Sequence, residues 1–237
     1  MNQSKVMRLD LGHQFPARWL WIRRLIVRRL ARSFECYHPV FLGQNQLSAG
    51  QRACMDRWQM IRQVLASDHI ENLLDVGCAE GFFVQHAALE HGILSLGIDA
   101  DVRRLTIANE TCLLNGVPNC GFMYAQVSPA FLKQLPTFDV VLFLSVLHHV
   151  MYEHGVDYAR AIMSSIRQKT KKFLIFDMGQ SNELEHSWSK KLPQMNPDPA
   201  TWISSFLQQC GFSDVQILGE TDAYQGATRR IVFVAKP

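Results

Sequence analysis

The sequence predicts an α/β fold in which buried strands alternate with helices around a mostly parallel sheet. Three apolar runs favour this class: residues 73–76, 94–99 and 140–144 each have the length and composition of a buried strand. Helical patterns lie between them. With 237 residues, 48% of them hydrophobic, the chain is long enough for one well-buried domain (36–237) and a short extension (1–35).

The extension is basic, whereas the rest of the chain is not. Residues 1–35 carry a net charge of +6, and the remainder carries about −3. Residues 17–34 predict an amphipathic helix with Trp19, Ile22, Ile26, Leu30 and Phe34 on one side and Arg24, Arg28 and Arg32 on another. Such a helix could contact an anionic membrane surface or pack on its own domain. A nucleic-acid arm is the weaker third alternative, since nothing else in the chain is basic.

The segment that precedes the first strand predicts a loop and then a helix. Pro39 and Gly43 favour a loop. Ser48 and Gln51 have the spacing of a capping box, which predicts a helix that begins there and continues through residue 65.

The turn after residues 73–76 has the strongest functional signal. It breaks at Gly77 and Gly81 and leads into a helix, so its backbone N–H groups would be free to meet a ligand. Asp75 would repel a pyrophosphate but would accept hydrogen bonds from a cationic ligand. Asp99 ends the next strand, where an acid commonly binds ribose hydroxyls. The nicotinamide pattern G-x-G-x-x-G is absent, and the plain alternative is a structural turn with two surface acids.

The remaining elements follow in order. Helices are predicted over 82–90, 101–115, 156–169 and 202–210, and further strands over 122–125 and 172–177. Residues 215–218 and 230–234 predict an antiparallel pair at one end of the sheet. The strand over 140–144 delivers Ser145, His148 and His149 to the carboxyl edge, where open α/β sheets bind ligands. A buried histidine is often only a core residue, but one of this pair is a candidate acid or base.

A long polar segment, residues 179–199, is predicted to be a substrate loop, and it carries Glu183, His186 and Trp188. The six cysteines form no C-x-x-C pair, which favours reduced, buried thiols over disulfides or a metal site. No apolar run reaches the roughly 20 residues of a membrane span, and no secretory signal is evident. We therefore expect a cytoplasmic protein.

The DVGCAEG turn, Asp99 and the stretch FDVVLFLSVLHHV resemble class I S-adenosylmethionine-dependent methyltransferases over most of residues 70–237. The resemblance implies a Rossmann-like, seven-stranded, mostly parallel sheet with a reversed terminal strand and helices on both faces. It implies S-adenosyl-L-methionine as the cofactor; we expect no metal, in line with the scattered cysteines. The cofactor residues that it implies are Asp75, Gly77, Cys78, Ala79, Gly81, Asp99, Ala100, Gln126 and Ser145.

A narrower likeness rests on YHP (37–39), GQR (50–52), Arg57, LSVLHHV, EHSW (185–188), CGF (210–212) and GET (219–221). Two further segments belong to the likeness, HGVD (154–157) and RRIVF (229–233). Together these segments resemble the methyltransferase domain of bacterial O-antigen chain-terminating enzymes. The likeness implies that Tyr37, His38 and Arg57 also touch the cofactor and that His148 or His149 faces the acceptor. We assign Arg52, Glu183, His186 and Trp188 to the substrate.

The expected activity is O-methylation of a glycan or glycolipid hydroxyl, or of a terminal phosphate, in surface polysaccharide synthesis. His149 or His148 would be the general base for a hydroxyl, whereas for a phosphate the histidine and Arg52 would position the oxygens. The expected partner is a lipid-linked glycan, with peripheral membrane contact through residues 17–34. The alternatives are a small-molecule methyltransferase, an RNA 5′-phosphate methyltransferase and a non-catalytic cofactor-binding partner protein.

Overall fold

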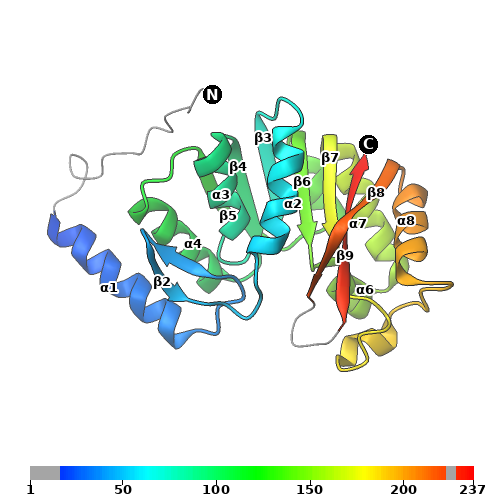
Figure 1. Ribbon diagram of the computed structural model, residues 1–237, viewed down its shortest axis with the longest axis horizontal. Coiled ribbons are helices and arrows are strands. Elements are labelled where there is room, and N and C mark those ends of the chain that lie inside the picture. Colours follow the sequence, from blue (N-terminus) through cyan, green and yellow to red (C-terminus); the bar gives the residue numbers. More distant parts are fainter. Residues whose placement is uncertain (1–16, 223–227) are drawn as a thin grey trace. The chain divides into compact units, whose positions relative to one another are not determined.

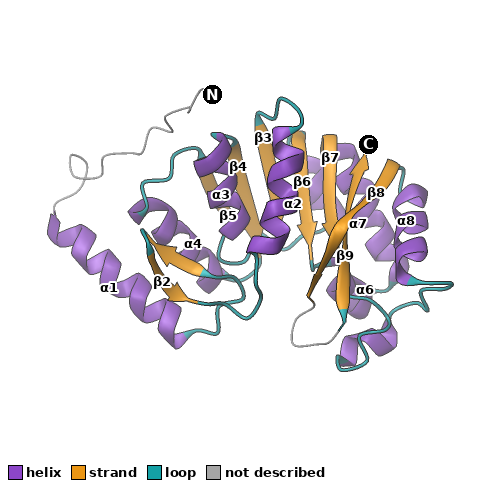
Figure 2. Ribbon diagram, viewed as in Figure 1, coloured by secondary structure: helices purple, strands orange, loops and turns teal. Residues whose placement is uncertain are grey.

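The computed structural model describes residues 17–222 and 228–237, so residues 1–16 of the predicted extension lie outside the described part. The chain forms two compact units (Figure 1). The first comprises residues 1–58 and 65–125, and the second comprises residues 59–64 and 126–237. Each unit alternates strands with helices (Figure 2).

The predicted α/β class is confirmed by the order of the strands. Seven strands form one sheet in the order β5-β4-β3-β6-β7-β9-β8. The strands β3, β4 and β5 are parallel, and so are β6 and β7. The strand β9 runs antiparallel to both β7 and β8. The sheet is therefore mostly parallel with a reversed strand toward one end, as the sequence predicts.

The first unit contains α1 (Ala17–Ser33), β1 (Val40–Leu42), β2 (Asn45–Ser48), β3 (Asn72–Val76), α3 (Phe82–His91), β4 (Leu94–Asp99), α4 (Val102–Leu114) and β5 (Cys120–Tyr124). The strand β3 buries four of its five residues, which explains its unbroken apolar sequence. Asp101 caps α4 by accepting the Arg103 N–H at 2.9 Å. The helix α2 (Met55–Ala66) contributes residues to both units.

The second unit contains α5 (Pro129–Gln134), β6 (Phe138–Leu144), α6 (Leu147–His154), α7 (Val156–Lys169), β7 (Thr170–Asp177), the 3₁₀ helix η2 (Ser187–Lys191), α8 (Pro199–Gln209), β8 (Ser213–Asp222) and β9 (Arg229–Lys236). All seven residues of β6 are buried. The short helices α5 and α6 were not predicted, because neither is long enough to show a helical period. As a result, His148 and His149 lie on a helix.

The prediction for residues 37–51 is wrong in two places. Residues 40–42 and 45–48 form an antiparallel hairpin, where a loop and a helix start were expected. The capping box does not form: Gln51 donates its amide to Glu35 at 2.9 Å. Gly50 has a φ of +71°, and a Cβ there would lie 2.5 Å from the His38 carbonyl carbon. Because Gly50 has a left-handed backbone and packs against the backbone of His38, the helix cannot begin at Ser48 and starts at Met55 instead.

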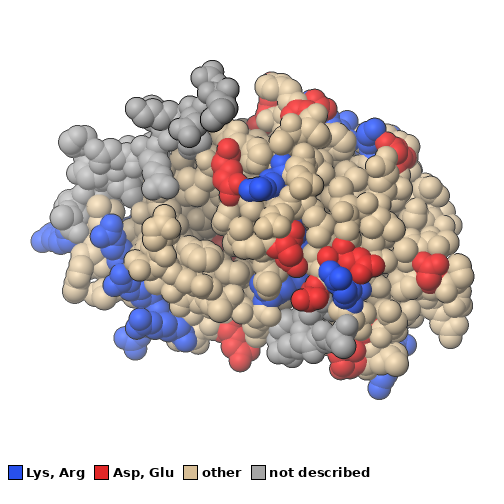
Figure 3. Space-filling model, viewed as in Figure 1, with Lys and Arg blue, Asp and Glu red and all other residues tan. Residues whose placement is uncertain are grey.

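The helix α1 packs through only part of the predicted apolar side: Leu30 and Phe34 pack on the core, whereas Trp19, Ile22 and Ile26 do not. Leu20, Val27 and Ala31 lie against β1 and α4, and Arg23 forms an ion pair with Glu110 of α4 at 2.6 Å. Trp19, Trp21, Ile22, Leu25 and Ile26 are exposed. The helix therefore does pack on its own unit, but its solvent side is both apolar and basic, with arginines gathered along α1 in Figure 3.

The expectation of reduced thiols is wrong for one pair. Cys112 near the end of α4 forms a disulfide with Cys120 at the start of β5. The other four cysteines are free and buried. The sequence gives no sign of the pair, because the spacing matches no cysteine motif and the contact depends on how β5 packs beside α4. Among the described residues, no helix combines the length and apolar character that crossing a membrane requires.

Candidate functional site

The first unit carries a sharp turn between β3 and α3. Gly77 and Gly81 have φ angles of +84° and +75°, and Ala79 has a φ of +47°, an uncommon value for a residue with a side chain. A Cβ on Gly81 would collide with the ring of Phe122. Cys78 is buried, and a Cβ on Gly97 would approach its sulfur to 2.7 Å. The turn therefore depends on these glycines, as predicted from the sequence.

The carboxylate of Asp99 stabilises this turn from the neighbouring strand. Its Oδ2 accepts the Ala79 N–H at 2.8 Å, and its Oδ1 accepts the Asp101 N–H at 2.8 Å. Ala100 beside it is exposed. Each oxygen retains a second lone pair, so the same carboxylate can accept further hydrogen bonds from ligand hydroxyls.

Asp75 is a buried acid two residues before Gly77 of this turn. It is 1% exposed, and its Oδ2 has no hydrogen-bond partner among the described residues. Burial, together with the negative charge of Asp99, raises the pKa of Asp75 to about 7, and the positive charge of Arg57 opposes the rise. A buried carboxylate oxygen without a donor is costly unless a ligand satisfies it. The residue therefore suits a ligand that carries an ammonium group.

Glu80 joins the turn to the segment before the hairpin, a role that sequence analysis missed. It is buried, and its two carboxylate oxygens accept the backbone N–H groups of Tyr37 at 3.0 Å and His38 at 2.8 Å. Burial raises the pKa of Glu80, while these hydrogen bonds and Arg104 oppose the rise. Tyr37 and His38 are thereby fixed beside the glycine turn. The sequence signal that could have revealed this role is the glutamate within the DVGCAEG segment.

Two buried arginines complete this part of the first unit. Arg57 lies over the ring of Phe83 at 5.1 Å and donates to Cys54 Sγ at 3.5 Å. Arg52 donates from Nη1 to the Tyr37 hydroxyl at 3.3 Å. The structure thus groups Arg52, which we assigned to the substrate, with Tyr37 and its neighbours in the first unit.

The second unit contains a separate buried polar cluster. Arg230 of β9 forms a bidentate ion pair with Glu183, with N–O distances of 2.7 and 2.8 Å, and it also donates to Ser145 Oγ at 3.3 Å. Ser145 has a φ of +58° and donates to Asp177 Oδ1 at 2.7 Å. Strained backbone of this kind is typical of functional sites. The sequence likeness includes Arg230 in RRIVF, but sequence analysis assigned no site role to Arg230 or Asp177.

The histidines and Trp188 lie beside this ion pair. Trp188 contacts His148 with ring centroids 4.5 Å apart and stacks on His186 at 5.1 Å. His148 is buried, and its Nδ1 accepts the Gly179 N–H at 3.0 Å, whereas His149 is exposed. Because Nδ1 of His148 acts as an acceptor, the neutral ring carries its proton on Nε2. The structure therefore separates the pair into one fixed ring and one accessible ring.

The predicted site residues fall into two sets. Those from Tyr37 to Ala100 lie in the first unit, and Gln126, Ser145, His148, His149, Glu183, His186 and Trp188 lie in the second. Gln126 is exposed just after β5. Residues 179–199 fold back on their own unit, with Ser189, Leu192 and Met195 buried.

Comparison with known proteins shows which family these residues come from. Residues 74–172, which include the turn, Asp99 and both histidines, match the model of a methyltransferase domain. This chain contains a class I S-adenosylmethionine-dependent methyltransferase domain. The features of the first unit fit that cofactor: Asp75 offers a carboxylate for its ammonium group, and Asp99 offers acceptors for its ribose hydroxyls.

The chain as a whole also has distant relatives. It is 24% identical over 198 residues to the O-antigen chain terminator bifunctional methyltransferase/kinase WbdD of Escherichia coli, covering 83% of this chain and 26% of the relative. It is 27% identical over 177 residues to a tRNA U34 carboxymethyltransferase of Tolumonas auensis, covering 69% of this chain and 51% of the relative. The chain thus spans about a quarter of WbdD.

Solved structures share the fold of the methyltransferase domain. WbdD with a kinase inhibitor superimposes with a TM-score of 0.75 at 24% identity, covering 88% of this chain and 47% of that structure. The N-terminal domain of EvdMO1 in the presence of SAH and D-fucose gives a TM-score of 0.63 at 19% identity, covering 90% of this chain and 96% of that structure.

Proposed function

We propose that this methyltransferase acts on an oxygen of a glycan or glycolipid, either a hydroxyl or a terminal phosphate, in bacterial surface polysaccharide synthesis. Two likenesses support the acceptor class: WbdD is described as an O-antigen chain terminator, and EvdMO1 was crystallised in the presence of D-fucose. The narrower sequence likeness around Tyr37 and the two histidines points to the same class.

The observation that supports the methyl-donor part of the proposal is the buried Asp75 oxygen without a partner among the described residues. S-adenosylmethionine, when bound, supplies a methyl group on a cationic sulfur. In our proposal Asp75 binds the ammonium of that molecule, Asp99 accepts its ribose hydroxyls, and the backbone from Gly77 to Gly81 surrounds it. Glu80 holds Tyr37 and His38 in position for the same task.

In this proposal the second unit supplies the groups that bind and deprotonate the acceptor. His149 is exposed and takes the proton of an acceptor hydroxyl, while the buried His148 fixes Gly179 through its Nδ1. For an ionised phosphate no proton is removed, and His149 only orients the oxygens. We propose that Arg52 positions Tyr37, given the hydrogen bond between them, with no direct role at the acceptor.

Replacing His149 with Ala tests the base. For a hydroxyl acceptor we expect turnover to fall by about 10²–10⁴-fold, the usual contribution of a general base. For a phosphate acceptor we expect a much smaller loss. His154→Ala, at the other end of α6 and also exposed, is the matched control and should leave turnover unchanged. Equal turnover of the His149 variant and the wild type on a hydroxyl acceptor would refute this role.

The acceptor itself is tested by incubation with a labelled methyl donor. Lipid-linked glycans, free sugars and RNA with a 5′-phosphate form the panel. The glycan proposal predicts label in the first group. RNA is a second candidate because one relative is described as a tRNA-modifying enzyme. Label in the RNA arm alone would replace the glycan proposal.

We also propose that the protein contacts the cytoplasmic face of the membrane through α1. The helix exposes Trp19, Trp21 and Ile22 beside several arginines. Tryptophan and arginine on one helix surface favour an anionic lipid interface.

A further inference from the structure

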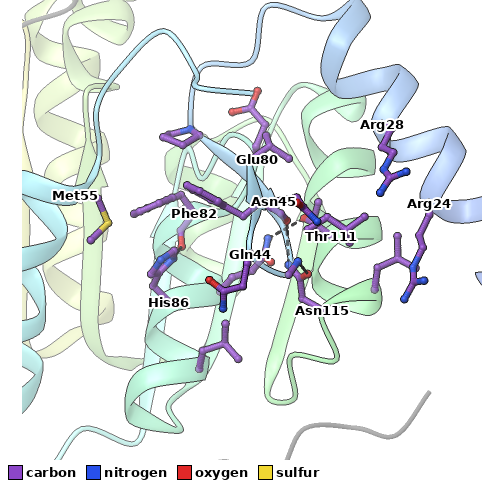
Figure 4. Close-up of a pocket in the computed structure, with 18 residues that line it drawn as sticks. Arg24, Arg28, Gln44, Asn45, Met55, Glu80, Phe82, His86, Thr111 and Asn115 are labelled. Atoms are coloured by element: carbon purple, nitrogen blue, oxygen red, sulfur yellow. Dashed lines mark hydrogen bonds between the residues drawn. The ribbon is translucent and has the colours of Figure 1, made fainter. Parts of the chain in front are cut away.

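The first unit has a cavity that the proposed chemistry does not use. It has a volume of about 590 Å³ and lies among α1, the β1–β2 hairpin, α3 and α4 (Figure 4). Its inner wall comes from one face of α3, where Phe82, Gln85, His86 and Leu89 follow helical spacing.

The cavity is lined by neutral polar groups from α3, from the end of α4 and from the hairpin. Gln85 donates to Thr111 Oγ1 at 3.0 Å, and both side chains are buried. Asn115 accepts the Gly43 N–H at 2.8 Å and donates to the Phe41 carbonyl at 3.1 Å, which holds the hairpin in place (Figure 4). Gln44 and Asn45 at the hairpin tip add two exposed amides. Amides and hydroxyls of this kind exchange hydrogen bonds with sugar hydroxyls.

An aromatic surface lies beside these groups. The rings of Phe82 and His86 stack with centroids 4.0 Å apart. Burial lowers the pKa of His86, and its Nδ1 lies 2.8 Å from the Phe82 carbonyl oxygen. Nδ1 therefore carries the proton of the neutral ring, and Nε2 is an acceptor. An apolar wall with single acceptors suits the mixed surface of a sugar ring.

Two arginines give the cavity its charge. Arg24 and Arg28 lie one turn apart on α1, and both extend from the helix toward the cavity in Figure 4. Among the described residues, no carboxylate pairs with either one. The acid on the lining, Glu80, is already satisfied by the N–H groups of Tyr37 and His38. Two guanidinium groups at this spacing favour a phosphate over a neutral ligand.

We propose that this cavity binds a phosphorylated sugar, with Arg24 and Arg28 on the phosphate and the Gln85–His86 wall on the ring. As a biological role, the inference rests on the proposed glycan acceptor, and the cavity would be an accessory subsite for a phosphate-bearing glycan. Its binding can nevertheless be measured without methyl transfer, so that failure of one proposal is distinguishable from failure of the other.

Calorimetry with glucose 1-phosphate and mannose 1-phosphate tests the proposal on the full chain. Arms with inorganic phosphate and with the free hexoses separate the two halves of the ligand. We expect the sugar phosphates to bind in the millimolar range or tighter, inorganic phosphate to bind more weakly, and the free hexoses most weakly. No heat from either sugar phosphate at millimolar concentration would overturn the proposal.

Reversing the charge of the two cavity arginines tests whether the sugar phosphate binds in this cavity. The double variant Arg24→Glu/Arg28→Glu should weaken sugar phosphate binding by at least about tenfold. The matched control Arg29→Glu/Arg32→Glu changes the same charge on the same helix but does not touch this cavity, and it should stay within about twofold. All four side chains are exposed, so both variants are expected to fold. Equal losses in the two variants would reduce the effect to general charge and refute the site.

A phosphate-bearing oligosaccharide then distinguishes the source of the ligand. Tighter binding than that of the monosaccharide phosphate would assign the cavity to the polymer. Equal binding would assign it to a free sugar phosphate. Both results support the recognition chemistry that we propose.

Discussion

The Asp99 carboxylate accepts the Ala79 N–H at 2.8 Å, so the acid that ends β4 holds the turn that follows β3. The Ala79 backbone has a positive φ, which costs energy that this hydrogen bond offsets. Asp99 thus has two functions in our account: it stabilises the shape of the turn and offers acceptors to the cofactor.

Replacing Asp99 with Ala should weaken S-adenosylmethionine binding by at least about 100-fold, because both functions are lost. Isothermal titration calorimetry measures the change. Asp101→Asn is the control: Asp101 caps α4 two residues away, and asparagine caps as well as aspartate. Undiminished affinity in the Asp99 variant would show that the turn does not need this acid.

Binding of the cofactor should depend on the charge of Asp75. With its pKa raised to about 7, the unliganded carboxyl is largely protonated below that pH and cannot pair with an ammonium. The dissociation constant should rise by up to about tenfold for each pH unit below 7 and level off above it. Asp75→Asn should remove this dependence. A wild-type constant that is flat between pH 5.5 and 8 would contradict the account.

The same shift affects folding. The folded pKa of Asp75 lies above its ordinary value of 3.8, so its contribution to the stability of the unliganded protein is lost as the pH rises from about 4 through 7. Cofactor should therefore raise the melting temperature more at pH 8 than at pH 5.5, and thermal unfolding at the two pH values checks this.

The candidate binding site for the methyl donor could be predicted from the sequence because it depends on the backbone conformation of one short turn and on acids close to it in the chain. Glycines at 77 and 81 and acids at 75 and 99 are short-range signals, and the structure places all four residues in one unit. Glu80 was not assigned a role, because the N–H groups that it accepts come from a segment about 40 residues earlier. The hairpin at 40–48 was mispredicted, and the Gly50 that follows it lies against the His38 backbone, a contact that no sequence pattern shows.

Arg230 and its neighbour Arg229 offer a matched test of burial. Arg230→Ala removes the partner of the buried Glu183 and should cost about 3–5 kcal/mol of unfolding free energy. Arg229 is exposed and faces Glu220 and Asp222 at 3.8 and 3.9 Å, so Arg229→Ala should cost at most about 1 kcal/mol. Urea unfolding compares them, and similar losses would contradict the difference in burial.

This ion pair also shows where sequence reasoning fails. Glu183 and Arg230 are 47 residues apart and come from a loop and a strand. A charged residue within a strand ordinarily indicates a solvated position. The structure buries it because the segment after β7 folds back over its own unit, which only the tertiary fold determines.

Membrane contact should depend on the exposed apolar side chains of α1. Truncation is a poor test, because α1 covers Ile107 and Leu114 of α4. The triple variant Trp19→Ser/Ile22→Ser/Ile26→Ser keeps the packed face and should reduce cosedimentation with phosphatidylglycerol-containing vesicles several-fold. Leu94→Ser, which removes an exposed apolar side chain elsewhere in the first unit, is the control. Unchanged sedimentation of the triple variant would rule out this surface.

The central claim is that the turn at Asp75 binds S-adenosylmethionine, and calorimetry on the folded chain tests it most directly. The account predicts saturable heat with S-adenosylmethionine and with its demethylated product, and no comparable heat with a nicotinamide nucleotide. It also predicts that Asp75→Asn loses affinity for both S-adenosylmethionine and its demethylated product. No binding heat with S-adenosylmethionine or with its demethylated product, or tighter binding of the nicotinamide nucleotide, would contradict it.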